Sequence, residues 1–245
     1  MLTALRRWAR ATVPEAPRIA VAALRRWLRD RVTGEGRRLV RRSASTAPLA
    51  HCIVEIGQPI RNTAFLDGKL ANLRLGASLL DGVTIAPSEI FSFWALVGRP
   101  SAESGFALGR SIRSGAVAGE IGGGLCQLSG IAYELLLRVG FGVLERHAHS
   151  RDLYREEERF TPLGLDATVV WPYRDLRLVN ALDVPVSVRF AVEGLTLRAS
   201  LHTSRAIAPR PIQIERTDHP GRREVAVSRD GVPVSNDHYL LVATF

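Results

Sequence analysis

The sequence is poor in cysteine and lacks the spacings that cysteine and histidine adopt in common metal sites. Cys52 and Cys126 are the two cysteines in 245 residues, too few for a disulfide framework and suited to a reducing compartment. Neither CxxC nor HExxH occurs, so the usual zinc-binding patterns are excluded. We therefore expect no metal ligands and no cofactor.

Long apolar runs are also missing. No segment approaches the roughly 18 to 20 apolar residues that cross a bilayer. None combines an uninterrupted apolar stretch of about 7 to 15 residues with a small-residue cleavage site. We expect neither an export signal nor a transmembrane helix. Together with the scarcity of cysteine, this predicts a cytoplasmic protein, or one bound peripherally at the inner face of the membrane.

Net charge is confined to one part of the chain. Residues 1–44 contain 12 arginines and three acidic residues, a net charge of +9 that equals the net charge of the whole chain. We interpret residues 1–44 as a solvated basic N-terminal arm; the alternative is an amphipathic segment on an anionic membrane surface. No nucleic-acid-binding module accompanies the charge, so nucleic acid is not an expected partner.

The rest of the chain divides into a main domain, residues 45–205, and a small β-rich C-terminal extension, residues 206–245. Apolar spacing predicts a helix from Leu66 to Leu80 with Asp67 as its N-cap, and a hairpin over residues 184–202. The glycine-rich residues 98–120 are expected to form an irregular loop that faces a substrate. The predicted fold class is α+β, with a cysteine-bearing helix and a second helix packed on a mostly antiparallel sheet.

The strongest local signal runs from Gly119 to Ser150. Three glycines, residues 122–124, lead directly into Cys126, and apolar residues then recur at three- and four-residue steps until Gly140 ends the pattern. Cys126 is therefore predicted in the first turn of a buried helix. Free backbone N–H groups and the helix dipole favour an anion there, which for cysteine is the thiolate.

Two histidines and an aspartate follow this helix. If residues 143–150 form a strand, His147 and His149 lie on one face of it, because side chains alternate along a strand. Glu145 shares that face and is expected to support His147. Asp166 is predicted on a further strand, residues 165–170.

The motifs GGGLCQLS, ERHAHS and GLDATV resemble those of the VanW family over roughly residues 55–205. Its members are named from glycopeptide-resistance gene clusters, and no biochemical activity is established for them. The resemblance implies a link to the cell envelope and a peptide or cell-wall precursor as ligand. One departure is that Gly130 follows Ser129, where relatives usually carry a pair of hydroxyl residues.

A cysteine at a helix start, then histidine, then aspartate is the order found in papain-like and transglutaminase-like thiol enzymes. We predict Cys126 as nucleophile, His149 as proton carrier with His147 second, and Asp166 as the group that fixes the imidazole tautomer. Candidate substrate-binding or oxyanion donors are Gly123, Gly124, Gln127 and Ser129. The predicted function is a hydrolase or an acyl or peptidyl transferase that acts on an amide, a peptide or a cell-wall precursor.

Alternatives remain open at this point. Free cysteines are often buried and inert, and the domain can be a non-catalytic binding or scaffolding module of the cell envelope. A metal site of Cys126, His147, His149 and Asp166 has suitable ligand types but a weak spacing. The sequence does not determine the oligomeric state.

Overall fold

The computed structural model describes residues 14–41, 49–61, 64–113, 116–152, 156 and 159–241. Its central sheet is antiparallel, with the strand order β1–β10–β9–β2. These strands are β1 (His51–Pro59), β2 (Thr84–Ile85), β9 (Val186–Glu193) and β10 (Thr196–Thr203). The predicted hairpin is confirmed, since β9 and β10 pair directly and Gly194 makes the turn with a positive φ of 56°.

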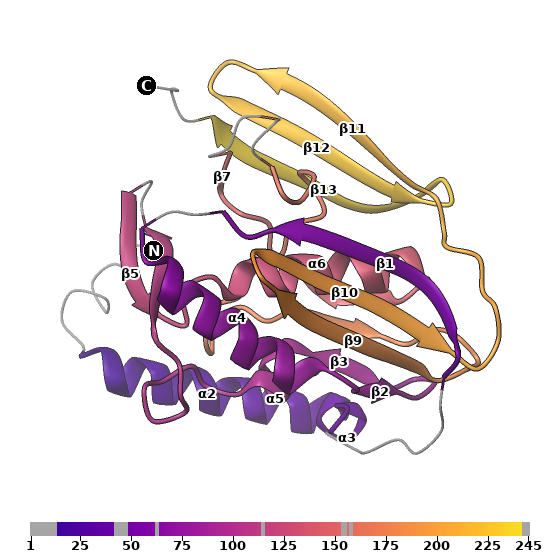
Figure 1. Cartoon of the computed structure of the whole chain (residues 1–245), viewed down its shortest axis with the longest axis horizontal. Coiled ribbons are helices and arrows are strands. Elements are labelled where there is room, and N and C mark those ends of the chain that lie inside the picture. Colours follow the sequence, from indigo (N-terminus) through magenta and orange to yellow (C-terminus); the bar gives the residue numbers. More distant parts are fainter. Residues whose placement is uncertain are drawn as a thin grey trace.

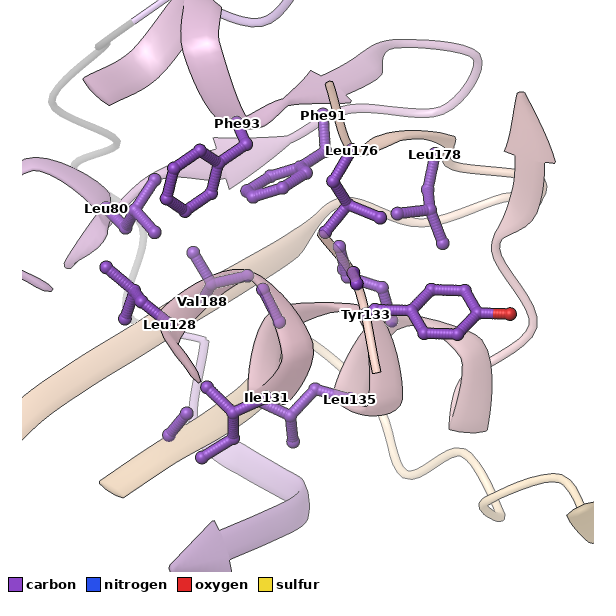
Figure 2. Close-up of a cluster of buried hydrophobic side chains, with 14 of the residues drawn as sticks. Leu80, Phe91, Phe93, Leu128, Ile131, Tyr133, Leu135, Leu176, Leu178 and Val188 are labelled. Atoms are coloured by element: carbon purple, nitrogen blue, oxygen red, sulfur yellow. The ribbon is translucent and has the colours of Figure 1, made fainter. Parts of the chain in front are cut away.

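Two helices, α4 (Leu66–Leu80) and α6 (Leu125–Arg138), pack against each other and against this sheet. Their approach is close, because a Cβ on Gly76 of α4 would lie 2.7 Å from Cδ2 of Leu128. Figure 2 shows Leu128, Ile131 and Leu135 of α6 within the cluster that forms the core, and all three are fully buried. The predicted apolar face of α6 is confirmed. The predicted N-cap of α4 is wrong, since Phe65 occupies that position and Asp67 lies inside the first turn.

A smaller antiparallel sheet, β3–β8–β6, lies beside these helices. It contains β3 (Ile90–Ser92), β6 (Gly142–Glu145) and β8 (Arg177–Val179), and the short helix α5 (Phe93–Val97) follows β3. The Ser92 hydroxyl caps α5 by accepting a hydrogen bond from the Ala95 amide. This cap fixes the point at which the chain passes from β3 into α5.

The glycine-rich residues 98–120 do not form one irregular loop. Most of the second half is an antiparallel hairpin of β4 (Leu108–Arg113) and β5 (Ala116–Ile121). Gly109 of β4 allows close contact with neighbouring backbone, because a Cβ on it would lie 2.3 Å from the Gly123 carbonyl oxygen. Across the same hairpin, a Cβ on Gly68 of α4 would lie 2.0 Å from the Leu108 carbonyl oxygen. Close packing of α4 against β4 therefore requires glycine at residue 68.

The C-terminal residues form a separate sheet with the order β11–β12–β13–β7. Its strands are β11 (Ile212–His219), β12 (Arg222–Arg229), β13 (Val232–Leu241) and β7 (Arg151–Asp152), which pairs in parallel with β13. Figure 1 shows this sheet on one side of the central sheet and the N-terminal helix α2 on the other. The β-rich character of this region is confirmed, while the domain boundaries at residues 45 and 206 stay predictions.

The described part of the N-terminal segment is helical and joined to the rest of the protein. It forms α2 (Glu15–Val32) and α3 (Glu35–Arg38). The Asp30 carboxylate accepts two hydrogen bonds from Arg177 at 2.6 and 2.8 Å, and Arg26 forms a bidentate pair with Glu145. The expectation of a solvated arm is therefore wrong for residues 14–41. Over the described ranges, no helix combines the length and apolarity needed to cross a membrane.

Candidate active site at the start of helix α6

The glycine triplet positions the start of α6 through close backbone contacts. A Cβ on Gly123 would lie 2.2 Å from the Gly109 carbonyl oxygen of β4, a distance that no side chain tolerates. Gly124 is the N-cap and has a φ of 102°, which favours glycine. The Asn72 side chain of α4 donates to the carbonyl oxygens of both Ala107 and Gly123 at 3.0 Å. These contacts fix the turn that presents Cys126.

The Cys126 side chain lies in the first turn of α6, half-buried, and meets two polar groups. One is the His149 ring, whose pKa the Cys126 side chain helps to raise. The other is the Val169 carbonyl oxygen, which lies 3.7 Å from the sulfur. The His149 side chain is 42% exposed, so a solute can approach the ring from solvent.

Asp166 holds His149 in place. Its Oδ2 accepts hydrogen bonds from the His149 backbone amide at 2.7 Å and from Nδ1 of the ring at 2.6 Å. Because Nδ1 faces Asp166, Nε2 is the nitrogen left for Cys126. The structure thus brings Cys126, His149 and Asp166 together, with His149 hydrogen-bonded to Asp166, in the order in which a thiol nucleophile, a proton carrier and an orienting carboxylate are used.

Charge within this series favours an imidazolium. Burial by itself lowers the pKa of His149, but hydrogen bonds with Asp166 and Cys126, and their negative charges, raise that pKa to about 10. Burial likewise raises the pKa of Asp166, yet its bond to His149 and the positive charges of His149 and Arg146 hold the pKa well below its usual range. At neutral pH the site therefore holds a carboxylate beside a protonated ring.

Three residues support Asp166, and two of them, Asp237 and Tyr239, belong to no motif that the sequence analysis identified. Arg146 donates to Oδ1 of Asp166 at 3.0 Å and also pairs with Asp237. The hydroxyl of Tyr239, which is fully buried, donates to the same Oδ1 at 2.6 Å. Tyr239 and Asp237 belong to β13, so the C-terminal sheet helps to position the carboxylate.

His147 takes a different place from the one predicted. The strand expected through both histidines is wrong, because β6 ends at Glu145 and residues 146–149 are extended without strand pairing. The expected strand at residues 165–170 is wrong for the same reason. His147 Nε2 lies 3.2 Å from Glu145. Burial raises the pKa of Glu145, but hydrogen bonds from Arg26, the Asp175 amide and His147 lower it to about 2.

The predicted oxyanion donors separate into two groups. Within the described residues, the backbone N–H groups of Gly124 and Cys126 have no acceptor, whereas the Gly123 N–H donates to Glu120 at 2.9 Å. Both side chains are engaged elsewhere: Gln127 donates to the Pro59 carbonyl at 3.0 Å and Ser129 to the Ala167 carbonyl at 2.7 Å. The free donors are therefore backbone amides.

Other features do not compete with this site. No cluster of three or more histidine, cysteine, aspartate or glutamate side chains arranged to hold a metal ion occurs among the residues that the structure places. A surface hollow lined by Leu137, Phe141 and Arg229 lies at the opposite end of α6 from Cys126.

Comparisons with known proteins agree with the motifs. A family profile described as "VanW like protein" matches residues 68–202. The chain is similar to the "Uncharacterized protein YoaR" of Bacillus subtilis (strain 168), with 30% identity over 139 residues, which are 57% of this chain and 44% of that protein. It is also similar to the "Vancomycin B-type resistance protein VanW" of Enterococcus faecalis (strain ATCC 700802 / V583), with 30% identity over 119 residues, 49% of this chain and 43% of that protein. The chain thus spans less than half the length of either relative, and no solved structure matches significantly.

Proposed function

The chain belongs to the VanW-like protein family, and we propose that it is a cysteine-dependent hydrolase or acyl transferase that acts on an amide or peptide bond. The observation that carries the proposal is the His149 ring, which joins the Cys126 side chain to Asp166 at the start of α6. An inert cysteine needs neither an oriented imidazole nor a carboxylate behind it.

In the first step the Cys126 thiolate attacks the carbonyl carbon of the substrate. A carbon–sulfur bond forms, and the oxygen of the tetrahedral intermediate takes the negative charge. The free amides of Gly124 and Cys126 are suited to stabilise that oxygen. As the carbon–nitrogen bond breaks, the His149 imidazolium gives its proton to the leaving amine, which leaves an acyl thioester on Cys126.

In the second step His149, now neutral, takes a proton from water or from an acceptor amine as that molecule attacks the thioester. The carbon–sulfur bond breaks, and the thiolate and imidazolium are restored. Water gives net hydrolysis, and an amine gives transfer of the acyl group. One relative is named for vancomycin resistance, and on that ground we propose a peptide or cell-wall precursor as the substrate.

The reactivity of the two cysteines tests the proposal. Cys52 is exposed, whereas Cys126 is only half-exposed, so accessibility alone favours Cys52. If Cys126 is an activated thiolate, iodoacetamide at pH 7 should label it at least about tenfold faster than Cys52. Mass spectrometry of the protein and of its Cys52→Ser and Cys126→Ser variants measures both rates. Slow labelling of Cys126 would support the binding-module alternative.

A separate observation supports contact with a membrane surface. One face of α2 carries large apolar residues that are 47% to 87% exposed, namely Val21, Leu24, Trp27, Leu28 and Val32. Arginines, among them Arg25 and Arg31, flank this face. We propose that this face lies on an anionic membrane surface, because exposed apolar residues between arginines are typical of interfacial helices.

Vesicle binding tests that contact. We expect the protein to sediment with vesicles of phosphatidylglycerol and phosphatidylcholine and to bind pure phosphatidylcholine weakly. A Leu24→Glu and Leu28→Glu double variant should lose about tenfold or more in affinity, since each leucine contributes roughly 1.5–3 kcal/mol when buried. Leu195→Glu, at an exposed leucine of the β9–β10 turn, is the control and should bind normally. Equal binding by the double variant and the control would refute the contact.

A further inference from the structure

Lys69 is the single lysine of the chain, beside 32 arginines, and its environment is unusual. It lies on α4 and is only 8% exposed. Among the described residues, no carboxylate, carbonyl or hydroxyl accepts a hydrogen bond from its ammonium group. The Lys69 Nζ lies over the Phe160 ring, 5.8 Å from its centroid. A buried ammonium without an acceptor is costly, and the residues that the structure describes give this one no anionic hydrogen-bond partner.

The side chain of Lys69 lies over the start of α6. A Cβ on Gly124 would lie 2.7 Å from Cγ of Lys69 and 3.5 Å from its Cε. Gly124 is two residues from Cys126, and the free amides of these two residues are at the same helix end. The positive end of the helix dipole and the ammonium group therefore act on the same region beside the nucleophile.

Further positive charge surrounds this region. Arg110 of β4 and Arg61, which follows β1, are the charged groups that act on the Lys69 ammonium. Nε of Arg110 is itself buried without an acceptor. Burial first, and then these two guanidinium groups, lower the pKa of Lys69 to about 8. The positive charges of Lys69 and Arg110 together favour a bound anion.

Lysine also fits here where arginine does not. Its unbranched stem packs over Gly124 at a distance that already excludes a single methyl group on that glycine. A planar guanidinium is larger and needs several acceptors, whereas an ammonium is a compact point charge.

We propose that Lys69, with the N-terminus of α6 and Arg110, binds a carboxylate of the substrate next to the bond that Cys126 attacks. The proposal rests on the proposed function and makes it more specific: the substrate is an amide or peptide that carries a negative charge close to the scissile bond. A terminal or side-chain carboxylate of a peptide fits this description.

Two alkylating agents of almost the same size test the proposal. Iodoacetate carries a carboxylate and iodoacetamide does not, so the ratio of their rates at Cys126 reports the anion site. In a Cys52→Ser background, Lys69→Met should lower the iodoacetate-to-iodoacetamide ratio by about tenfold or more, because a nearby charge is lost. Arg74→Met, an exposed cation further along α4, is the matched control and should leave the ratio unchanged.

The protein without a Lys69 substitution gives a second measurement, which does not depend on folding of a variant. Because the pKa of Lys69 is about 8 and that of His149 about 10, the ratio should fall as the pH rises through about 8, while the imidazolium is still present. A ratio that is constant through this range and equal in both variants would overturn the anion site. Failure of both reagents to label Cys126 would instead overturn the proposed function.

Discussion

Replacing His149 by alanine should slow the alkylation of Cys126 by iodoacetamide at pH 7 by about tenfold or more. Asp166 and the Cys126 side chain together raise the pKa of the His149 ring to about 10. Above the ordinary histidine value of about 6.5, the folded protein therefore still holds an imidazolium that favours the thiolate. The alkylation rate of Cys126 is measured in a Cys52→Ser background by quenching the reaction at set times and quantifying the product by mass spectrometry.

The rate–pH curve makes this prediction specific. In the protein with His149, the imidazolium is fully present below about pH 6.5 and is lost only as the pH rises through about 10, so the rate should change little around neutrality. In His149→Ala the rate should rise with pH and follow an unassisted thiol, which titrates near about pH 8.5. His147→Ala is the control: His147 contacts Glu145, not Cys126, and should keep the flat curve. If His149→Ala leaves the curve in place, Cys126 is not paired with this ring.

The start of α6 could be predicted from sequence because its determinants are local. The glycine triplet, the apolar spacing after Cys126 and Gly140 at the end all lie within about five turns of one helix, where periodicity is informative. The order of cysteine, histidine and aspartate then named the three groups that the structure brings together. The pattern did not show that residues 146–149 leave the sheet, since the cause is Asp166, which binds both the amide and the ring of His149.

Contacts between distant residues could not be predicted. Tyr239 and Asp237 reach the site from a strand whose sequence shows only alternation. Nothing in the sequence around Lys69 indicates that its side chain is buried over Gly124. The glycines of residues 98–120 suggested a loop, but Gly109 is needed because the backbone of Gly123 passes so close to it. Glycine marks both free turns and tight packing, and a single sequence does not distinguish them.

The N-terminal segment shows the same difficulty with charge. Its segregated arginines suggested a solvated arm that does not pack on the rest of the protein. The structure places Asp30 of α2 against Arg177, which is 2% exposed and 147 positions away. Arg177 also donates to Asp175 at 2.9 Å and to Glu35 at 3.1 Å. A buried ion network of this kind depends on which surfaces meet, and net charge gives no sign of it.

Replacing Asp30 by alanine should therefore lower the free energy of unfolding by about 1.5–3 kcal/mol, because Arg177 loses its charge-assisted hydrogen bonds to Asp30 but keeps those to Asp175 and Glu35. Asp183→Ala is the matched control, because Asp183 pairs with Arg205 at the same distance of 2.6 Å, but both side chains are exposed. The control should leave stability almost unchanged, since solvent screens such a pair. Urea denaturation of both variants, followed by circular dichroism, compares the two ion pairs. Equal stability of the two variants would mean that α2 is held loosely and that the segment is dispensable after all.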